Sequence, residues 1–370
     1  MKIFAMFLKN FNLTNFRNYS QLELEFDTRP TIFVGNNAAG KSNILEAVYL
    51  LSTTKSQRVE NEDELIKEGE EFLKVEGFTT DDLMAGGDTE LLVIINKPTS
   101  EVSFRKKVLV NGISRRTVDF IGNLPAVIFY PSDINMVTGP PSLRRWHLDL
   151  ALAQIDPGYK KALTLYEQFL TARNRVLKRI REGQGRSDEL KYWTDELVEK
   201  GEGVRVKREE FFQFINSLQT PLGEFRFEYR QSPISVEKLQ ETNGREVAAA
   251  ATLIGPHRDD YAIQLEGRNL AHFGSRGEQR MATLAFKLAQ LEYMAKILGK
   301  RPILLLDDVF SELDSDHRAH VVKVVGRQQT IMTGVELENI PQDFLHSSRI
   351  LRVEEGKIID DRQKIENYLI

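Results

Sequence analysis

The sequence has 370 residues, 41% of them hydrophobic, so it can bury a substantial core and exceeds the usual size of one simple domain. It contains no cysteine, which excludes a disulfide framework and a cysteine-ligated metal and favours a reducing compartment; we expect the cytoplasm. A net charge of −4, from 50 basic and 54 acidic residues, gives no general attraction for nucleic acid, so a DNA contact would need a local patch.

No run of eighteen apolar residues occurs, so we expect no membrane span, and the short apolar start of the chain favours a strand over a signal peptide. Further strands are predicted where short apolar or alternating runs occur. Three early strands are expected at residues 2–13, 22–26 and 31–34. The runs at residues 72–78, 91–96 and 104–111, the last with a hairpin turn at Asn111-Gly112, suggest an antiparallel sheet beside a nucleotide core.

The run from Thr31 to Ser42 matches G-x-x-x-x-G-K-[ST], the phosphate-binding loop, and it stands between a predicted strand and a predicted amphipathic helix. The spacing lets successive N–H groups face a phosphate chain, while Lys41 reaches the β- and γ-phosphates and Ser42 can bind Mg²⁺. The predicted phosphate-binding residues are Gly35, Asn36, Asn37, Ala38, Ala39, Gly40, Lys41 and Ser42.

A short buried strand is expected at residues 125–130 and a helix from about Pro141. From residue 146 to about 218 the pattern is helical, with breaks at Gly183–Gly185 and Gly201–Gly203, which favours an antiparallel helical hairpin. We therefore expect a nucleotide-binding head whose two parts flank an inserted helical lobe. The predicted domains are residues 1–140, 141–222 and 223–370.

Residues 159–208 contain thirteen Lys and Arg against eight Asp and Glu, so this lobe carries +5 in an acidic protein. A cluster in its first half could neutralise DNA phosphates, and an ordinary solvated helix face is an equally good interpretation. The cluster consists of Arg173, Arg175, Lys178, Arg179 and Arg181.

The apolar run Ile303–Leu306 ends in Asp307 and Asp308, a pattern that places an acid at the end of a strand beside the phosphate-binding loop. Asp307 would hold Mg²⁺ and Asp308 would polarise the attacking water, so we predict Lys41, Asp307 and Asp308 as catalytic residues. Upstream, the turn around Ser275 and Gly277 opens a helix, which is a second anion site or a capped core helix.

In this order, the motifs resemble an ABC-type ATPase head, and more narrowly the RecF family of DNA replication and repair proteins. The segments that carry this resemblance are Phe16–Tyr19, Gly139–Arg145 with Asp149, Gly255–Asp260, Ser275–Arg280 and Leu305–Asp314.

The resemblance implies an SMC-like head that binds ATP and Mg²⁺, with Arg17 among the nucleotide-binding residues. Two subunits would meet head to tail, so that Ser275 and Gly277 of one face the γ-phosphate held by Lys41 of the other. Such a homodimer would bind double-stranded DNA and junctions of single- and double-stranded DNA, act with RecO and RecR, and hydrolyse ATP slowly under DNA stimulation.

The sequence departs from the family pattern at Pro131-Ser-Asp133, and His257 is either a loop-orienting or a structural histidine. Lys55 and Arg58 either point at nucleotide or form a solvated pair. Two rival functions share part of the pattern. A transporter ATPase subunit is disfavoured by Asp308 and Thr333, where transporters carry Glu and His, and a small-molecule kinase leaves the Ser275 turn unexplained.

Overall fold

The computed structural model describes residues 4–80, 87–98, 104–219, 222–335 and 337–359. The chain divides into two compact units. The first combines Met1–Asp133 with Leu284–Ile370, and the second is Ile134–Thr283, so in sequence the second unit is an insertion into the first. The predicted α/β head with an added antiparallel sheet and an inserted helical part is confirmed.

A six-stranded sheet forms the base of the first unit, in the order β17-β16-β4-β15-β14-β9, and only β17 runs antiparallel to its neighbour. Four of its strands, β4, β15, β14 and the edge strand β9, are buried along their whole length, as expected for a parallel sheet covered on both faces. The strands are β4 (Thr31–Val34), β9 (Ala126–Phe129), β14 (Ile303–Leu306), β15 (Thr330–Gly334), β16 (Arg349–Glu354) and β17 (Lys357–Ile359).

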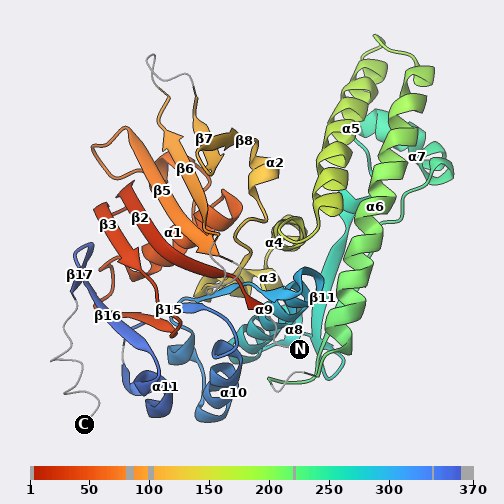
Figure 1. Ribbon diagram of the computed structural model, residues 1–370. Coiled ribbons are helices and arrows are strands. Elements are labelled where there is room, and N and C mark those ends of the chain that lie inside the picture. Colours follow the sequence, from red (N-terminus) through yellow and green to blue (C-terminus); the bar gives the residue numbers. More distant parts are fainter. Residues whose placement is uncertain (1–3, 81–86, 99–103, 220–221, 336, 360–370) are drawn as a thin grey trace. The chain divides into compact units, whose positions relative to one another are not determined.

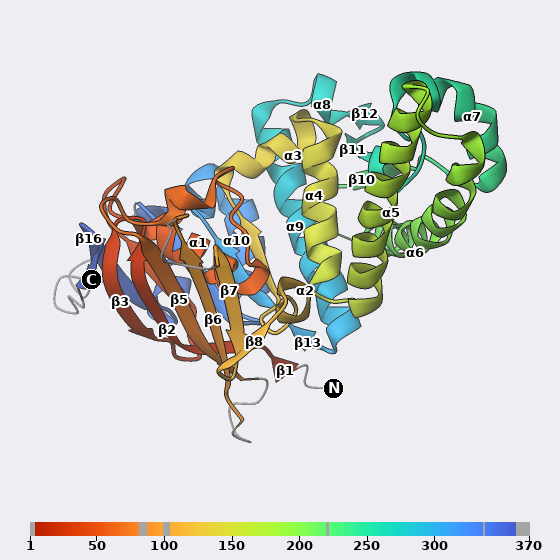
Figure 2. The ribbon, with the colours of Figure 1, turned by 90° about the horizontal axis from the view of Figure 1, so that it is seen from above.

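The second sheet of this unit is antiparallel, in the order β3-β2-β5-β6-β7-β8, and Figure 2 shows its strands side by side. Asn111 and Gly112 have φ of 50° and 71°, which confirms the predicted tight hairpin. The strands are β2 (Phe7–Phe16), β3 (Tyr19–Glu25), β5 (Phe72–Thr80), β6 (Thr89–Asn96), β7 (Lys106–Val110) and β8 (Ile113–Arg115); a short pair joins β1 (Phe4–Ala5) to β13 (Lys300–Arg301).

Helix α1 (Lys41–Thr53) contacts β2, β5 and β6 of the antiparallel sheet and β9, β14 and β15 of the parallel sheet (Figure 1). Its almost complete burial follows from this position, because both flanks of the helix meet a sheet. The other helices of the first unit are α2 (Thr117–Phe120), α10 (Ser315–Val325) and α11 (Gln342–His346), with 3-10 turns at Glu62–Leu65, Pro131–Ile134, Val309–Glu312 and Leu337–Asn339.

The second unit contains the predicted helical hairpin, formed by α5 (Pro157–Arg181) and α6 (Leu190–Ser217), which lie side by side in Figure 1. Pro141 begins α4 (Pro141–Ala153), as its position predicted. The remaining elements are α3 (Asn135–Thr138), α7 (Val236–Ala249), α8 (Leu270–Phe273), the three-stranded sheet β10 (Phe225–Arg230), β11 (Asp260–Leu265) and β12 (Arg268–Asn269), and 3-10 turns at Ser187–Glu189 and Pro256–Arg258. Helix α9 (Arg276–Leu298) begins in this unit and ends in the first.

The structure differs from the sequence predictions in two respects. Gly201 and Gly203 do not interrupt α6; a Cβ on Gly201 would lie 3.1 Å from Tyr166 and 3.2 Å from Ile234, so this glycine permits close packing inside the helix. The second unit also exceeds the predicted lobe of residues 141–222, because residues 223–283 pair and pack with the helices there: β10 bonds to β11, and α6 contacts β10.

Candidate functional site

The loop between β4 and α1 turns through two glycines with positive φ, 148° at Gly35 and 114° at Gly40. A Cβ on Gly35 would lie 2.3 Å from the carbonyl oxygen of Val353, so a larger residue does not fit there. The loop thereby leads directly into the N-terminus of α1. The unpaired N–H groups of such a terminus attract a phosphate.

Lys41 is the first residue of α1 and is only 7% exposed. Its ammonium donates hydrogen bonds to the carbonyl oxygens of Gly35 (2.7 Å) and Asn36 (2.9 Å). Burial lowers the pKa of Lys41, whereas the carboxylates of Asp308 and Asp307 act to raise it. The cation therefore lies inside the curl of the loop and in the field of both predicted catalytic acids.

Three side chains meet at the end of the parallel strands. The Ser42 hydroxyl and the Thr333 hydroxyl each donate to Oδ1 of Asp307 at 2.7 Å. Strand β15 lies between β4 and β14, so parallel pairing brings the carboxyl ends of all three strands to one edge. Ser42 and Asp307 supply the oxygen ligands that Mg²⁺ prefers. Two side-chain ligands fill only part of the coordination shell of Mg²⁺, so water and phosphate oxygens would fill the rest. The two residues fit the predicted metal role.

Asp308 follows in a left-handed conformation, with φ of 49°, and its backbone N–H donates to the Thr333 hydroxyl at 3.0 Å. Such a conformation is uncommon for a residue with a side chain and often occurs at functional sites. Thr333 thus joins both acids: it donates to the first and accepts from the second. The role of Asp308 as the water-polarising group stays a prediction.

Asp133 is buried, at 3% exposure, and forms an ion pair with Lys287 at 3.2 Å. Its carboxylate also accepts the backbone N–H of Tyr130 at 3.0 Å. Burial raises the pKa of Asp133, and Lys287 opposes this shift. The structure therefore gives this acid a structural partner in the position that the sequence left open.

The turn between β2 and β3 supports the phosphate-binding loop from behind. Asn18 donates its amide to the Ala39 carbonyl and Tyr19 its hydroxyl to the Gly40 carbonyl, both at 3.1 Å. Burial raises the pKa of Tyr19, which keeps the hydroxyl a donor. The sequence reasoning missed these two supporting roles, although it had singled out Phe16–Tyr19 as a motif, and that motif was the signal that could have found them.

Arg17 and Arg58 both bind Glu46, a carboxylate in α1 that is 1% exposed. Arg17 donates two hydrogen bonds to it, at 3.0 and 2.8 Å, and Arg58 donates one at 3.2 Å and another to Asn43 at 3.0 Å. Glu46 was not predicted, because one acidic residue in an amphipathic helix carries no sequence signal. Contact of Arg17 or Arg58 with nucleotide stays a prediction.

Ser275 and Gly277 belong to the second unit and are exposed at the start of α9. The Ser275 hydroxyl accepts the N–H of Glu278 at 3.2 Å, and the Glu278 carboxylate accepts the N–H of Ser275 at 2.7 Å. This reciprocal pair is a capping box, and the backbone N–H of Ser275 lowers the pKa of Glu278. The contacts show a capped helix start, one of the two interpretations that the sequence left open, and a role in binding the partner's nucleotide stays a prediction.

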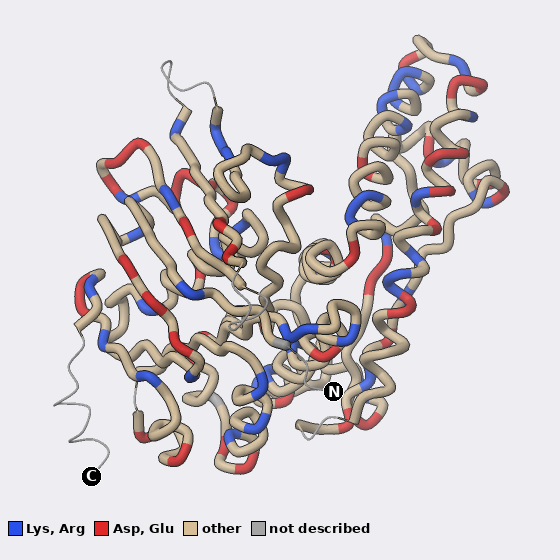
Figure 3. Tube along the Cα trace, in the orientation of Figure 1, with Lys and Arg blue, Asp and Glu red and all other residues tan. Residues whose placement is uncertain are grey.

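Four residues of the predicted DNA cluster are exposed along α5, namely Arg175, Lys178, Arg179 and Arg181, and Figure 3 shows the basic residues along this helix. The prediction that Arg173 binds DNA is wrong. It is 1% exposed and donates to Glu246 (2.7 Å), Thr252 (2.7 Å) and Thr194 (3.2 Å), so it is not available to a phosphate. Helical spacing explains the difference, since Arg173 shares the inward face with the buried Val176 and Leu177.

The Gly255–Asp260 segment is held inside the second unit by charged contacts. Arg208 of α6 donates to Asp259 at 2.8 Å and to Asp149 at 2.7 Å, and Arg144 pairs with Asp260 at 2.6 Å. These ion pairs join α4 and α6 to the segment that leads into β11. The role of the Gly255–Asp260 motif is therefore structural: its ion pairs hold the segments of the second unit together.

His257 lies in the same segment. Its ring nitrogens are 2.6 Å from the Tyr166 hydroxyl and 3.0 Å from the Thr252 carbonyl oxygen. Burial lowers the pKa of His257 to about 4, so the imidazole is neutral at pH 7. Of the two interpretations that the sequence left open, the contacts support the structural one.

The glycine loop, the apolar strand that ends in Asp307 and the capped turn before α9 together define an ATPase head of the SMC type. A family model described as the RecF/RecN/SMC N-terminal domain matches residues 7–339. The DNA replication and repair protein RecF of Bacillus velezensis is 34% identical, with 96% of this chain and 100% of that protein covered. RecF of Geobacillus kaustophilus is 36% identical over 95% of this chain and 99% of its own. The chain belongs to the RecF family.

Solved structures agree with this assignment. A structure of the recombination mediator protein RecF with ATP, from the RecFOR pathway, has a TM-score of 0.84 at 28% identity and covers 96% of this chain and 99% of its own. The Smc head domain of Pyrococcus furiosus, at 15% identity and a TM-score of 0.54, shares the fold. Family membership sets aside the transporter and kinase alternatives.

No helix in the described ranges combines the length and the hydrophobicity that crossing a bilayer requires.

Proposed function

We propose that this protein is an ATP-dependent DNA-binding protein of recombinational repair and replication restart, acting in the cytoplasm. ATP with Mg²⁺ would join two subunits on double-stranded DNA near gaps and junctions, and slow, DNA-stimulated hydrolysis would release them. The observation that carries the proposal is the meeting of Ser42, Thr333 and Asp307 beside the curled loop around Lys41. In this scheme ATP is a switch, and binding to DNA is the main activity.

Within one subunit, the N-terminus of α1 and Lys41 would bind the phosphates, and Ser42 with Asp307 would hold the metal ion. The ion supplies charge neutralisation at the β- and γ-phosphates. Asp308 is placed one residue beyond the metal-binding acid, where it would accept a hydrogen bond from the attacking water. Phosphoryl transfer depends on positioning, and Thr333 fixes both acids relative to each other.

A second subunit would complete the site. The exposed Ser275 hydroxyl and the N–H groups at the start of α9 would bind an anion in place of their capping contacts with Glu278. In the head-to-tail arrangement that the family resemblance implies, Ser275 and Gly277 would bind the γ-phosphate held by Lys41 of the other copy. Each nucleotide would then be shared by two chains.

DNA would be bound through the exposed side of α5. Arg175, Lys178 and Arg181 recur at three-residue spacing, with Arg179 beside them, so they share one helix face. Lys178 and Arg179 have exposed acidic partners, Glu182 at 4.0 Å and Glu189 at 3.0 Å, and exposed pairs of this kind are weak enough to exchange for phosphates. The related structures come from proteins of the RecFOR pathway, and we propose RecO and RecR as partners here.

The test compares oligomeric state and DNA affinity with and without Mg-ATP. Light scattering should show a shift from monomer to dimer, and affinity for a gapped duplex should rise, at several salt concentrations. Ser275→Arg should stay monomeric while its ATP affinity stays at the wild-type value. A wild-type protein that remains monomeric and binds DNA equally well without ATP would refute the proposal; a Ser275→Arg variant that still dimerises would refute the trans role of Ser275.

A further inference from the structure

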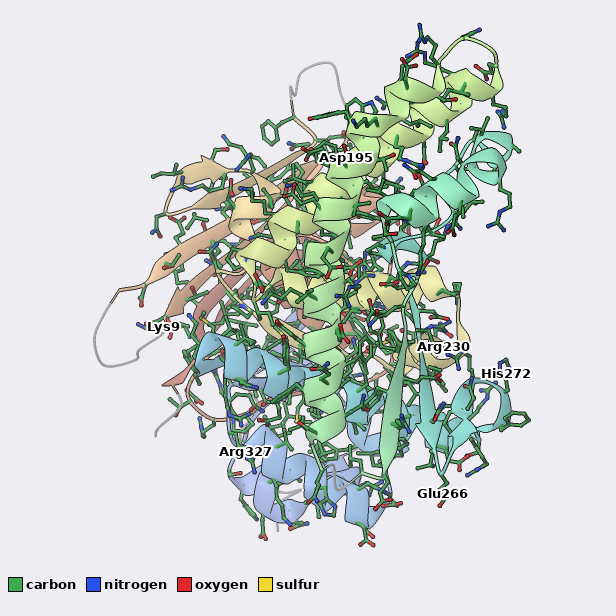
Figure 4. All side chains as sticks on the ribbon, turned by 90° about the vertical axis from the view of Figure 1, so that its right-hand side faces the viewer. Lys9, Asp195, Arg230, Glu266, His272 and Arg327 are labelled. Atoms are coloured by element: carbon green, nitrogen blue, oxygen red, sulfur yellow. The ribbon has the colours of Figure 1, made fainter. Side chains whose placement is uncertain are left out.

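Phe273, the last residue of α8, stands two positions before Ser275 and is 69% exposed. Among the residues that the structure describes, no other large hydrophobic side chain is exposed to this extent. Its neighbour His272, also exposed, marks the outer edge of α8 in Figure 4. An exposed phenylalanine forgoes most of the free energy that burial of its ring would release.

The turn that carries Phe273 is held in place from several sides. Asn269 caps α8 by accepting the N–H of Ala271 at 3.0 Å, and Leu270 is completely buried. The buried Gln279 donates its amide to the carbonyl oxygens of Leu270 (2.8 Å) and Gly274 (3.2 Å). The outward direction of the ring is therefore built into an ordered turn.

The first unit offers a concave surface beside its phosphate-binding loop. A pocket of about 650 Å³ is lined by residues 36–39 of the loop and by the β16–β17 hairpin. Most of its wall is polar or charged, and the apolar side chains that offer accessible surface to it are the exposed Ala38 and Ile359, which is 38% exposed. The polar and charged residues are Asn36, Asn37, Arg352, Glu354, Glu355 and Lys357. A small exposed apolar surface thus lies beside the phosphate-binding loop in the first unit, and an exposed phenylalanine lies beside the Ser275 turn in the second.

We infer that Phe273 is an apolar anchor that docks into this loop-side pocket of a second copy of the chain. The inference rests on the ATP-dependent dimer proposed above. The chain spacing restricts where the ring can go: two residues span at most about 7 Å, so a Ser275 that faces the partner's phosphate brings Phe273 beside the partner's phosphate-binding loop. Two anchors would be buried in a symmetric head-to-tail pair.

The experiment measures the dimer dissociation constant with Mg-ATP by light scattering for the full chain. Phe273→Ala should weaken dimerisation roughly tenfold or more, because two rings lose their burial, while Phe273→Leu should recover part of the affinity. Binding of a fluorescent ATP analogue to the monomer should not change. Tyr192→Ala is the matched control: this aromatic is 58% exposed on α6, and its loss should leave the dissociation constant unchanged.

The pocket is tested by Ile359→Asp. Alone it should also weaken the dimer, and added to Phe273→Ala it should cost less than its single effect, as expected for two side chains in contact. Additive effects would overturn the pocket as the receptor. If wild type dimerises and Ser275→Arg does not, yet Phe273→Ala matches wild type or Tyr192→Ala weakens the dimer equally, the anchor is refuted and the proposed function stands. A wild type that never dimerises refutes both.

Discussion

The buried polar groups at the phosphate-binding loop of the first unit and those of the helical second unit have different roles. In the first unit, the buried polar side chains Lys41, Asp307 and Thr333 surround the place where a nucleotide would bind. In the second unit, the buried cations Arg173 and Arg208 bind acids of their own unit. The Ser275 turn and the basic side of α5 are among the exposed groups of the second unit.

This difference teaches that burial of a charged residue has no single meaning in this chain. Beside the phosphate-binding loop it prepares a site for a ligand that brings its own charge. In the helical unit, buried charges hold together segments that are distant in sequence. Contacts with other molecules would be made by exposed residues. We expect substitutions of Lys41 and Asp307 in the first unit to affect ligand binding, and substitutions of Arg173 and Arg208 in the second unit to affect folding.

The strongest test of the comparison is Arg208→Met. It would leave Asp259, which is 3% exposed, without its cation, so unfolding of the second unit should become easier by about 3–5 kcal/mol. The sequence has two tryptophans, Trp146 and Trp193, both in the second unit, so their fluorescence during urea unfolding reports on it. Arg205→Met removes exposed pairs on the same helix and should cost about 1 kcal/mol or less. Equal losses would contradict the fastening role of Arg208.

Lys41→Ala should act on binding instead. Removing one charge-assisted contact to phosphate weakens a ligand by about 10- to 100-fold, so the affinity for Mg-ATP should fall by that factor, measured by calorimetry. The tryptophan-detected unfolding of the second unit should match wild type. Lys9→Ala, whose side chain pairs with Asp88 at the surface, is the control and should bind ATP normally. If Lys41→Ala binds ATP like wild type, the first unit does not hold nucleotide as we describe.

The pH dependence of stability tests the structural role of the buried His257 in the second unit. Its folded-state pKa of about 4 lies below the ordinary value of 6.5, so the unfolded chain takes up a proton first as the pH falls. This contribution to stability is complete above pH 6.5 and is lost progressively toward pH 4. Replacing His257 by Gln should reduce the acid-induced loss of stability between pH 7 and pH 5 by about 2 kcal/mol. An unchanged pH profile would show that His257 titrates normally in the folded protein.

The smallest effect is expected for the exposed arginines of α5. Arg175→Gln and Arg181→Gln should each weaken duplex DNA binding a few-fold and lower the slope of log affinity against log salt by about 0.9. Arg205→Gln, whose side chain is bound to Glu202 and Glu209 on α6, is the control. If the slope of log affinity against log salt is the same in Arg175→Gln, Arg181→Gln and the control Arg205→Gln, this face of α5 does not contact DNA.

Much of the head was predictable because its signals are local. The loop around Gly35–Ser42, the strand that ends at Asp307 and the Asn111-Gly112 hairpin each depend on a few neighbouring residues, and the structure has the strands, turns and helix start expected of them. The meeting of Ser42 with Asp307 agrees with the prediction that the apolar strand places its terminal acid beside the phosphate-binding loop.

The remainder depends on partners that are distant in sequence. Nothing near Arg173 indicates that it would meet Glu246, so it looked like any other cation of its cluster. Gly201 reads as a break because the sequence does not show the ring of Tyr166 packed against it. The same holds for Glu46, whose two arginines come from a turn before α1 and a loop after it.

The position of β4 in its sheet has a consequence for synthesis of the protein. This strand is made among the first residues, yet it pairs with β15 and β16, which are made near the end, and the Gly356 N–H donates to the Ala39 carbonyl of the phosphate-binding loop. Because non-local pairing of this kind must wait for the late strands, the loop cannot be completed until most of the chain has left the ribosome. A prematurely terminated chain would therefore contain the whole glycine motif and still lack a nucleotide site.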